Sequence, residues 1–337
     1  MKINNRRYLG NKYKLLPFIK KIISEECVDV KTFFDVFAGT GAVASAFLDK
    51  ELIVNDILYS NYLAHLTWLS AEAYSGEKIA ACIDFYNSLK DIASDNYMSV
   101  NFANTYFSYE VCKKIGFIRE DIEQKFAAGC LNRREHAMLV TSLLYAIDKI
   151  ANTCGHYDAY RKNVSYSNNF IMEVPEIEKE GLKSNSFYTE DSNELVKRIV
   201  CDLAYLDPPY NSRQYCDAYH LPENIARWEK PKVYGVAGKM DRSGLKSAYC
   251  TQKAVSAFAD LISKLRCRYI VLSYNNTGEG ADGRSNAKIS DDAIMRILSA
   301  KGQVTVFSQS YKAFSAGKSE NNHNQERLFL CKVNAKS

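Results

Sequence analysis

The residues of this chain best suited to chemistry are Asp-Pro-Pro-Tyr at positions 207–210, directly after the apolar run 203–206. Two consecutive prolines exclude helix and remove two backbone donors, so the segment is stiff and its carbonyls are free to accept hydrogen bonds. The Asp207 carboxylate and the Pro208 carbonyl can accept both N–H bonds of an exocyclic amine on an aromatic ring, while Tyr210 offers the ring a stacking face. Such acceptors aim the nitrogen lone pair at an electrophile, for example a sulfonium methyl, and the carboxylate stabilises the developing positive charge. Asp207, Pro208, Pro209 and Tyr210 are therefore predicted as catalytic, against the competing interpretation of a proline-fixed turn.

A glycine turn earlier in the chain has the features of a cofactor loop. Residues 37–44 read Phe-Ala-Gly-Thr-Gly-Ala-Val-Ala, and Gly39 and Gly41 let the backbone approach a ligand closely. The spacing also satisfies the dinucleotide fingerprint, and Asp56 ends the next apolar run, where it can accept from a ribose diol. Since S-adenosylmethionine and NAD both carry that diol, the turn alone leaves both cofactors open, and a tight turn without a ligand stays a third interpretation.

These residues need strands and helices to position them. Short apolar runs predict strands at 33–37, 52–54, 203–206 and 269–273, and an antiparallel pair at 303–307 and 327–330. A helix is predicted up to residue 26, with Leu15, Phe18, Ile19 and Ile22 on one face, and a small apolar helix at 42–48. Strand, glycine turn, helix and strand in this order predict an α/β fold with a parallel sheet.

Residues 60–185 interrupt the α/β pattern. Apolar residues at helical spacing predict one helix through Ile115, Ile118, Ile122 and Phe126 and another through Val140, Leu144, Ile147 and Ala151. We interpret 60–185 as an inserted, mostly helical region, and 1–59 with 186–337 as the domain that it interrupts.

Taken in order, these segments resemble the D12, or Dam-like, class of N6-adenine-specific DNA methyltransferases. Residues 7–12 resemble its N-terminal cofactor motif, 34–41 its glycine motif, 55–56 its ribose-binding pair and 207–210 its catalytic tetrapeptide. Many members carry Glu-Pro where this chain has Asp35-Val36, so the acid is kept. Asp191 resembles the acid that accepts from the adenine amine of the cofactor, with Glu190 as the alternative match. The resemblance implies cofactor-binding roles for Tyr8, Lys12, Asp35, Phe37, Gly39, Thr40, Gly41, Asp56 and Asp191.

The resemblance also implies the fold and the activity. The fold would be a Rossmann-like class I S-adenosylmethionine-dependent methyltransferase with its target-recognition region at 60–185. The enzyme would methylate the N6 amine of an adenine flipped out of double-stranded DNA. Residues 152–162 and 211–215 are similar to segments of restriction-linked members. They imply a type II modification enzyme that protects host DNA from a cognate endonuclease, with which it forms no stable complex.

The charge of the chain permits a nucleic-acid partner. The formal net charge is +5 and the pI is about 8.5. Basic residues in the insertion and after the catalytic tetrapeptide neutralise phosphates or read guanine edges, and an aromatic residue beside them can stack. The residues predicted to bind DNA are Arg133, Arg134, Tyr160, Arg161, Lys162 and Arg213.

Other features exclude metal and membrane functions. The ten cysteines form no C-x-x-C pair, and His156 and His220 have no partner spacing that fits a metal. The start of the chain has no apolar signal segment and no run is long enough to span a bilayer, so we expect reduced thiols in a cytoplasmic protein. Trp68 and Trp228 are expected to pack inside the protein, and residues 273–275 to line a target pocket or form a turn.

Three other functions stay open from the sequence. The glycine turn alone would suit an NAD-dependent oxidoreductase, which leaves the catalytic tetrapeptide unexplained. A methyltransferase acting on RNA or on a protein amide would use the same residues. A DNA-binding regulator with a vestigial pocket is disfavoured, because the residues that would bind the cofactor are intact.

Overall fold

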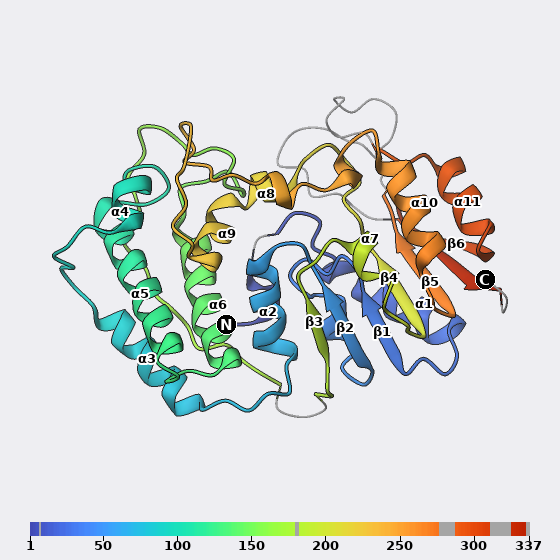
Figure 1. Ribbon diagram of the computed structural model, residues 1–337, viewed down its shortest axis with the longest axis horizontal. Coiled ribbons are helices and arrows are strands. Elements are labelled where there is room, and N and C mark those ends of the chain that lie inside the picture. Colours follow the sequence, from blue (N-terminus) through green and yellow to red (C-terminus); the bar gives the residue numbers. More distant parts are fainter. Residues whose placement is uncertain (7, 179–181, 276–286, 311–324, 335–337) are drawn as a thin grey trace.

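The computed structural model describes residues 1–6, 8–178, 182–275, 287–310 and 325–334. Arg7, the first residue of the N-terminal motif, lies outside these described residues. The described strands form one sheet in the order β3-β2-β1-β4-β5-β7-β6 (Figure 1). The strands are β1 (Thr32–Asp35), β2 (Glu51–Asn55), β3 (Ser186–Tyr188), β4 (Leu203–Leu206), β5 (Tyr269–Ser273), β6 (Gly302–Ser310) and β7 (Gln325–Val333).

The sheet is parallel from β3 to β5, and β7 is antiparallel to both of its neighbours. This confirms the predicted parallel strands and the antiparallel pair near the end of the chain. After β1 the chain builds outward to β2 and β3, and then returns to place β4 on the other side of β1. The crevice at such a switch point is where open α/β sheets bind ligands.

Helices cover both faces of the sheet because successive side chains of each strand alternate between the faces. Phe33, Leu52 and Leu203 pack in the core under α1 (Leu16–Glu26), and Phe34, Ile53 and Ala204 pack under the opposite helices. Those helices are α7 (Ser192–Leu195), α10 (Ala254–Lys264) and α11 (Asp291–Ser299). The predicted first helix is confirmed, with Leu15, Ile19 and Ile22 buried and Phe18 partly buried against the same core.

The predicted helix at 42–48 is wrong. Only a 3-10 turn, Ala44–Ala46, follows the glycine turn before β2 begins. Val43 still has helical backbone angles, but Phe47 leaves the helical region with φ −127° and ψ 39°, so the turn ends after Ala46. Phe47 then leaves the turn to stack on Phe33 of β1, with ring centroids 4.5 Å apart.

A helical body stands beside the sheet (Figure 1). We use this name for α2 (Tyr59–Leu69), α3 (Gly76–Ser88), α4 (Tyr97–Phe102), α5 (Tyr109–Ala127), α6 (Arg133–Ile150), α8 (Tyr215–Ala218) and α9 (His220–Arg227). The two helices predicted in the insertion are confirmed as α5 and α6. Their shared core takes residues from 58–172 and from 216–228, so the chain returns to the helical body after the catalytic tetrapeptide.

The body and the sheet meet at α2. This helix packs against α6 and β3, and it also contacts α9, which holds its N-terminal turn. The carboxylate of Glu223, which is fully buried, accepts the backbone N–H groups of Tyr59 and Ser60 at 2.8 and 2.9 Å. A carboxylate at the start of a helix satisfies otherwise unpaired donors and complements the helix dipole.

Candidate active site

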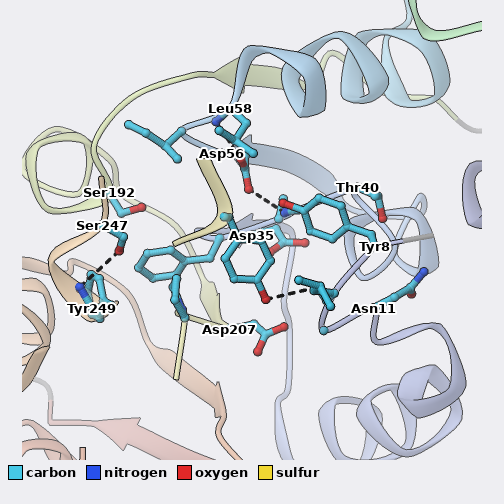
Figure 2. Close-up of a pocket in the computed structure, with 18 of the residues that line it drawn as sticks. Tyr8, Asn11, Asp35, Thr40, Asp56, Leu58, Ser192, Asp207, Ser247 and Tyr249 are labelled. Carbon is cyan, nitrogen blue, oxygen red and sulfur yellow. Dashed lines mark hydrogen bonds between the residues drawn. The ribbon is translucent and has the colours of Figure 1, made fainter. Parts of the chain in front are cut away.

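A cavity opens at the carboxyl edge of the sheet, above β1, β2 and β4. The empty space within it is about 1100 Å³, which includes a part that is open to solvent. Asp35 ends β1, Asp56 follows β2 and Asp207 follows β4, and all three line the cavity. Figure 2 shows their carboxylates grouped on one side of Tyr8. Parallel strands bring together acids that are far apart in the sequence.

The glycine turn forms one wall and is fixed by Asp56. The Gly39 N–H donates to Asp56 Oδ2 at 2.9 Å, and Leu58 N–H donates to Oδ1 at 2.9 Å. A Cβ added to Gly39 would lie 3.1 Å from Tyr8 Cε1, so a side chain there would crowd the aromatic ring. Thr40 is buried in the same turn and lines the cavity. Burial raises the pKa of Asp56 to about 6, although its hydrogen bonds oppose the shift.

Asp35 is the most buried acid of the site. Its Oδ2 accepts the Ala44 N–H at 3.1 Å, which ties the 3-10 turn to β1. Its Oδ1 is buried and makes no hydrogen bond within the described structure. Burial raises the pKa of Asp35 well above its usual value, and nearby Asp207 adds to the shift. An unpaired buried acceptor in a cavity wall suits a ligand that brings a donor or a positive charge.

The tetrapeptide 207–210, predicted from the sequence to be catalytic, follows the end of β4. Asp207 and Pro209 line the cavity. Two contacts fix Tyr210. Its carbonyl accepts the Lys288 N–H at 2.8 Å, and its ring meets the Tyr274 ring edge-on with centroids 6.4 Å apart. The tetrapeptide is therefore anchored while its acid faces the cavity.

Lys12 sets the charge around Asp207. Its Nζ lies 3.3 Å from Asp207 Oδ1, 3.9 Å from Glu326 Oε2 of β7 and 6.0 Å from the centroid of the Tyr210 ring. Burial alone would lower the pKa of Lys12, but the two carboxylates outweigh it and the pKa is raised. Burial raises the pKa of Asp207 to about 6, against the lowering effect of Lys12. With a pKa of about 6, Asp207 is mostly ionised at neutral pH and can accept hydrogen bonds.

Aromatic side chains and Asp191 complete the walls. Tyr8 stacks on Tyr219 with centroids 4.6 Å apart, and Phe37 meets Tyr249 edge-on at 5.1 Å. Asp191 lines the cavity and caps α7, where it accepts two backbone N–H groups at 2.9 and 3.2 Å. The alternative acid, Glu190, pairs with Arg198 and does not line the cavity.

Sequence reasoning missed a strap formed by residues 243–250. Gly244, Leu245, Lys246, Ser247 and Tyr249 line the cavity from this segment. Two hydrogen bonds from the Gln214 side chain hold the strap in place. Its Oε1 accepts the Ser247 N–H at 2.8 Å, and its Nε2 donates to the Ser247 carbonyl at 3.0 Å. Glu326 was missed as well. Neither carries a sequence signal, because the strap reaches the cavity, and Glu326 reaches Lys12, only through tertiary packing.

The residues predicted to bind DNA fall into different environments. Arg161, Lys162 and Arg213 are exposed. Arg133 is exposed and pairs with Glu72 at 3.3 Å. Tyr160 is half-buried, edge-on to Tyr106 with centroids 5.5 Å apart.

The prediction that Arg134 binds DNA is wrong, because its side chain is buried. Its guanidinium is buried and donates to the carbonyls of Glu72 and Thr67 at 2.6 and 3.3 Å. It lies 4.7 Å from the ring centroid of Tyr74. A side chain so enclosed holds α6 to the end of α2 and is unavailable to DNA.

Several histidine, tryptophan and strand-end residues singled out in the sequence are buried. His220 Nε2 is buried within hydrogen-bond distance of the Tyr157 carbonyl and the Tyr106 hydroxyl, at 2.8 and 3.2 Å. Trp68 and Trp228 are buried, as expected. Ser273 and Tyr274 are buried and lie outside the cavity lining.

All ten cysteines are free, and within the described ranges no cluster of side chains fits a metal ion. No described helix has the length and apolar character needed to cross a membrane.

Comparisons with known proteins agree with this geometry. Residues 8–279 match the family model of the D12 class N6 adenine-specific DNA methyltransferases. The chain is 34% identical to the modification methylase StsI of Streptococcus sanguinis, over 96% of this chain and 51% of that protein. It is 32% identical to the type II methyltransferase M.FokI of Planomicrobium okeanokoites, over 81% of this chain and 45% of that protein. Against M.NlaIII of Neisseria lactamica the identity is 30%, over 96% of both chains. The chain thus spans about half the length of the first two relatives and nearly all of the third.

Proposed function

We propose, from the premise that this chain belongs to the D12 class N6 adenine-specific DNA methyltransferases, that it methylates the N6 amine of adenine in double-stranded DNA. The observation that carries the proposal is the position of Asp207, on a stiff segment at the end of β4 and facing the glycine-lined cavity. The fold is that of a class I methyltransferase, with five parallel strands and an antiparallel β7.

The cofactor that this site suits is S-adenosylmethionine, which supplies an electrophilic methyl group on a sulfonium. Asp56 and the glycine turn would hold its ribose, Asp191 its adenine, and Tyr8 and Asp35 its charged end. The buried, unpaired Oδ1 of Asp35 supports this fit, because it needs a donor or a cation. A dinucleotide fits less well, since pyrophosphate is bound at the start of a helix and only a 3-10 turn follows Gly41.

The chain's own residues prepare the target amine. The Asp207 carboxylate and the Pro208 carbonyl accept its two N–H bonds, which turns the nitrogen lone pair toward the methyl donor. The nitrogen gains positive charge during transfer, and the Asp207 carboxylate stabilises it. Asp207 does not need to be a strong base, because the methylated cation is itself acidic and its proton can leave to water.

Access to the amine requires the adenine to leave the duplex. We propose that residues 60–185 form the target-recognition region, and that the segment 216–228 belongs with it structurally because both build one core. Arg161, Lys162 and Arg213 are the exposed cations that we propose for phosphate contacts.

A biological role follows from the relatives, which are named as modification and type II methyltransferases. We propose that this chain modifies DNA in a restriction-modification system. It would protect host sites from an endonuclease that reads the same sequence without forming a stable complex with the methyltransferase.

The test is transfer of a tritiated methyl group from S-adenosylmethionine to duplex DNA, followed by digestion and mass spectrometry of the nucleosides. The expected product is N6-methyladenine at one sequence context. Label in RNA or protein alone, or binding of NAD in place of S-adenosylmethionine in calorimetry, would contradict the proposal. Matching single-stranded DNA and RNA of the same sequence serve as the controls.

A further inference from the structure

A buried amide lies behind the cavity wall and connects two of the groups that line it. Asn61, in the first turn of α2, is fully buried and is not among the residues that line the cavity. Its Nδ2 donates to the Tyr8 hydroxyl at 2.9 Å and to Asp56 Oδ1 at 3.0 Å. Tyr8 comes from the N-terminal segment and Asp56 from the end of β2, so one side chain joins two segments that are far apart in the sequence.

The chemistry of the amide suits both partners. An asparagine NH2 group has two donors, and Asn61 directs one to each partner. The orientation of the amide is defined by the ionised Asp56, which only accepts, so the nitrogen must face it. Because Asn61 donates to the Tyr8 hydroxyl, Tyr8 keeps its own proton for an acceptor elsewhere. Neither aspartate nor leucine at this position would supply the two donors.

The helix that carries Asn61 is itself held firmly. Its N-terminal N–H groups are accepted by the buried Glu223 carboxylate of α9. One turn further along the same face, His65 Nε2 lies 2.8 Å from the Gly39 carbonyl. Residues four apart lie on one face of a helix, so α2 contacts the acid, the aromatic ring and the glycine turn together. A group that fixes a binding site must be rigidly supported, and α2 meets this condition.

We infer that Asn61 is a positioning residue for cofactor binding, which holds Tyr8 and Asp56 in the geometry that the cofactor requires. The inference rests on the proposed function, because the cofactor is taken to be S-adenosylmethionine. Asn61 itself does not touch the cofactor and acts through these two partners.

The test compares the wild-type chain with Asn61→Leu, which keeps much of the side-chain volume and removes both donors. The probe is S-adenosylhomocysteine, the demethylated form of the cofactor, and its Kd is measured by calorimetry. We expect the Kd to rise at least about tenfold in Asn61→Leu, the change produced by about 1.4 kcal/mol of lost binding free energy. Thr67→Val is the matched control, because Thr67 is a buried polar residue of the same helix that bonds Leu63 and Thr141, away from the cavity. It is expected to keep the wild-type Kd.

Two further readouts separate positioning from general loss of stability. In a double-mutant cycle with Tyr8→Phe, the two effects on Kd should be clearly less than additive, since both variants remove the same hydrogen bond. In a pH series, wild-type affinity should fall as the pH drops through about 6, where Asp56 gains a proton. The Asn61 hydrogen bond lowers the pKa of Asp56, so its loss should move the midpoint to higher pH. The titratable groups that face Asp56 are Tyr8, Asp35 and Glu223, and Asn61→Leu removes none of them.

The outcomes are distinct. Wild-type binding together with an unchanged Kd in Asn61→Leu would overturn the inference alone. An equal loss of affinity in Thr67→Val, or strictly additive effects in the cycle, would overturn it too, by showing a general structural defect. Failure of the wild-type chain to bind S-adenosylhomocysteine would overturn the inference and the proposed function together.

Discussion

At the scale of single residues, the three carboxylates of the site differ in the groups that balance their negative charge. Asp207 faces a buried ammonium, Asp56 accepts protein N–H groups, and Asp35 keeps one unpaired oxygen. Burial raises the pKa of all three above the usual range, but only Asp207 is followed directly by a proline pair. This supports the proposal that Asp207 serves the reaction and that the other two acids bind the cofactor.

Asp207→Ala is expected to lower the methyl-transfer rate at least about 100-fold, because the acceptor that stabilises the developing charge is lost. Cofactor affinity should stay within a few-fold of wild type. Asp202→Ala is the matched control, since this acid precedes β4 at the opposite edge of the sheet and binds Lys31 and Thr32 N–H groups. Single-turnover transfer and calorimetry check both statements. Full activity in Asp207→Ala would reject the assigned role.

The pH dependence of transfer should report the same acid. The reaction needs the ionised Asp207, whose pKa is about 6, so the rate with both substrates saturating should fall as the pH is lowered through about 6. Glu326 raises this pKa, so Glu326→Gln is expected to move the midpoint to lower pH. A rate independent of pH between about 5 and 7 at saturation would contradict this assignment, with the stability of the enzyme checked at each pH by circular dichroism.

At the scale of elements, the glycine turn depends on backbone angles that favour glycine and on contacts with Asp56 and His65. Gly41 has a φ of 85°, and a Cβ added there would lie 3.0 Å from His65 Cδ2. The turn is therefore fixed by its own backbone and by α2 behind it. The strap is fixed differently, through the paired hydrogen bonds between Gln214 and the backbone of Ser247.

Gly41→Ala is expected to lower the free energy of unfolding by about 1–2 kcal/mol and to weaken cofactor binding, because the left-handed backbone is strained and the turn must move away from His65. Gly129→Ala provides the control. Gly129 has a similar φ of 72° at the end of α5, with nothing within 4 Å of an added Cβ. It should lose similar stability and keep the cofactor Kd. Thermal unfolding and calorimetry on both variants test this, and equal Kd values in the two variants would contradict it.

At the scale of the whole molecule, the helical body is tied to the sheet through α2 and the segment that follows the tetrapeptide. A duplex that binds the body, as we propose, would contact elements that are packed against the cavity wall. The buried Glu223 of α9 makes this connection, since it accepts from the start of α2. The exposed Arg161 and Lys162 follow Tyr160, which packs against the core of the body, and their side chains reach solvent for such a contact.

Arg161→Ala is expected to weaken binding to duplex DNA and to reduce the dependence of log affinity on log salt by about one phosphate contact, with stability nearly unchanged. Arg134→Ala should instead lower the free energy of unfolding by about 1–3 kcal/mol, because it removes a buried guanidinium that bonds two carbonyls. Fluorescence anisotropy over a salt series and urea unfolding separate the two. Unaltered duplex affinity in Arg161→Ala would remove its proposed contact.

The sequence by itself determined the strands that carry the acids, the glycine turn and the order of the segments. Each of these depends on local pattern: apolar runs form buried strands, and glycine and proline limit the backbone at fixed positions. Because the carboxyl ends of parallel strands share one edge of a sheet, these patterns alone suffice to bring Asp35, Asp56 and Asp207 to that edge.

Only the tertiary structure decided which side chains stand around those acids. Arg134 looks like a surface cation in the sequence, but the packing of α6 against α2 buries it. Three further contacts join segments that are far apart in the sequence. Glu326 contacts Lys12, Asn61 donates to Tyr8, and Gln214 accepts from Ser247 of the strap. Charge and periodicity describe neighbours along the chain, whereas burial and hydrogen bonding depend on contacts between distant segments, and those contacts exist only once the sheet and the helical body have packed together.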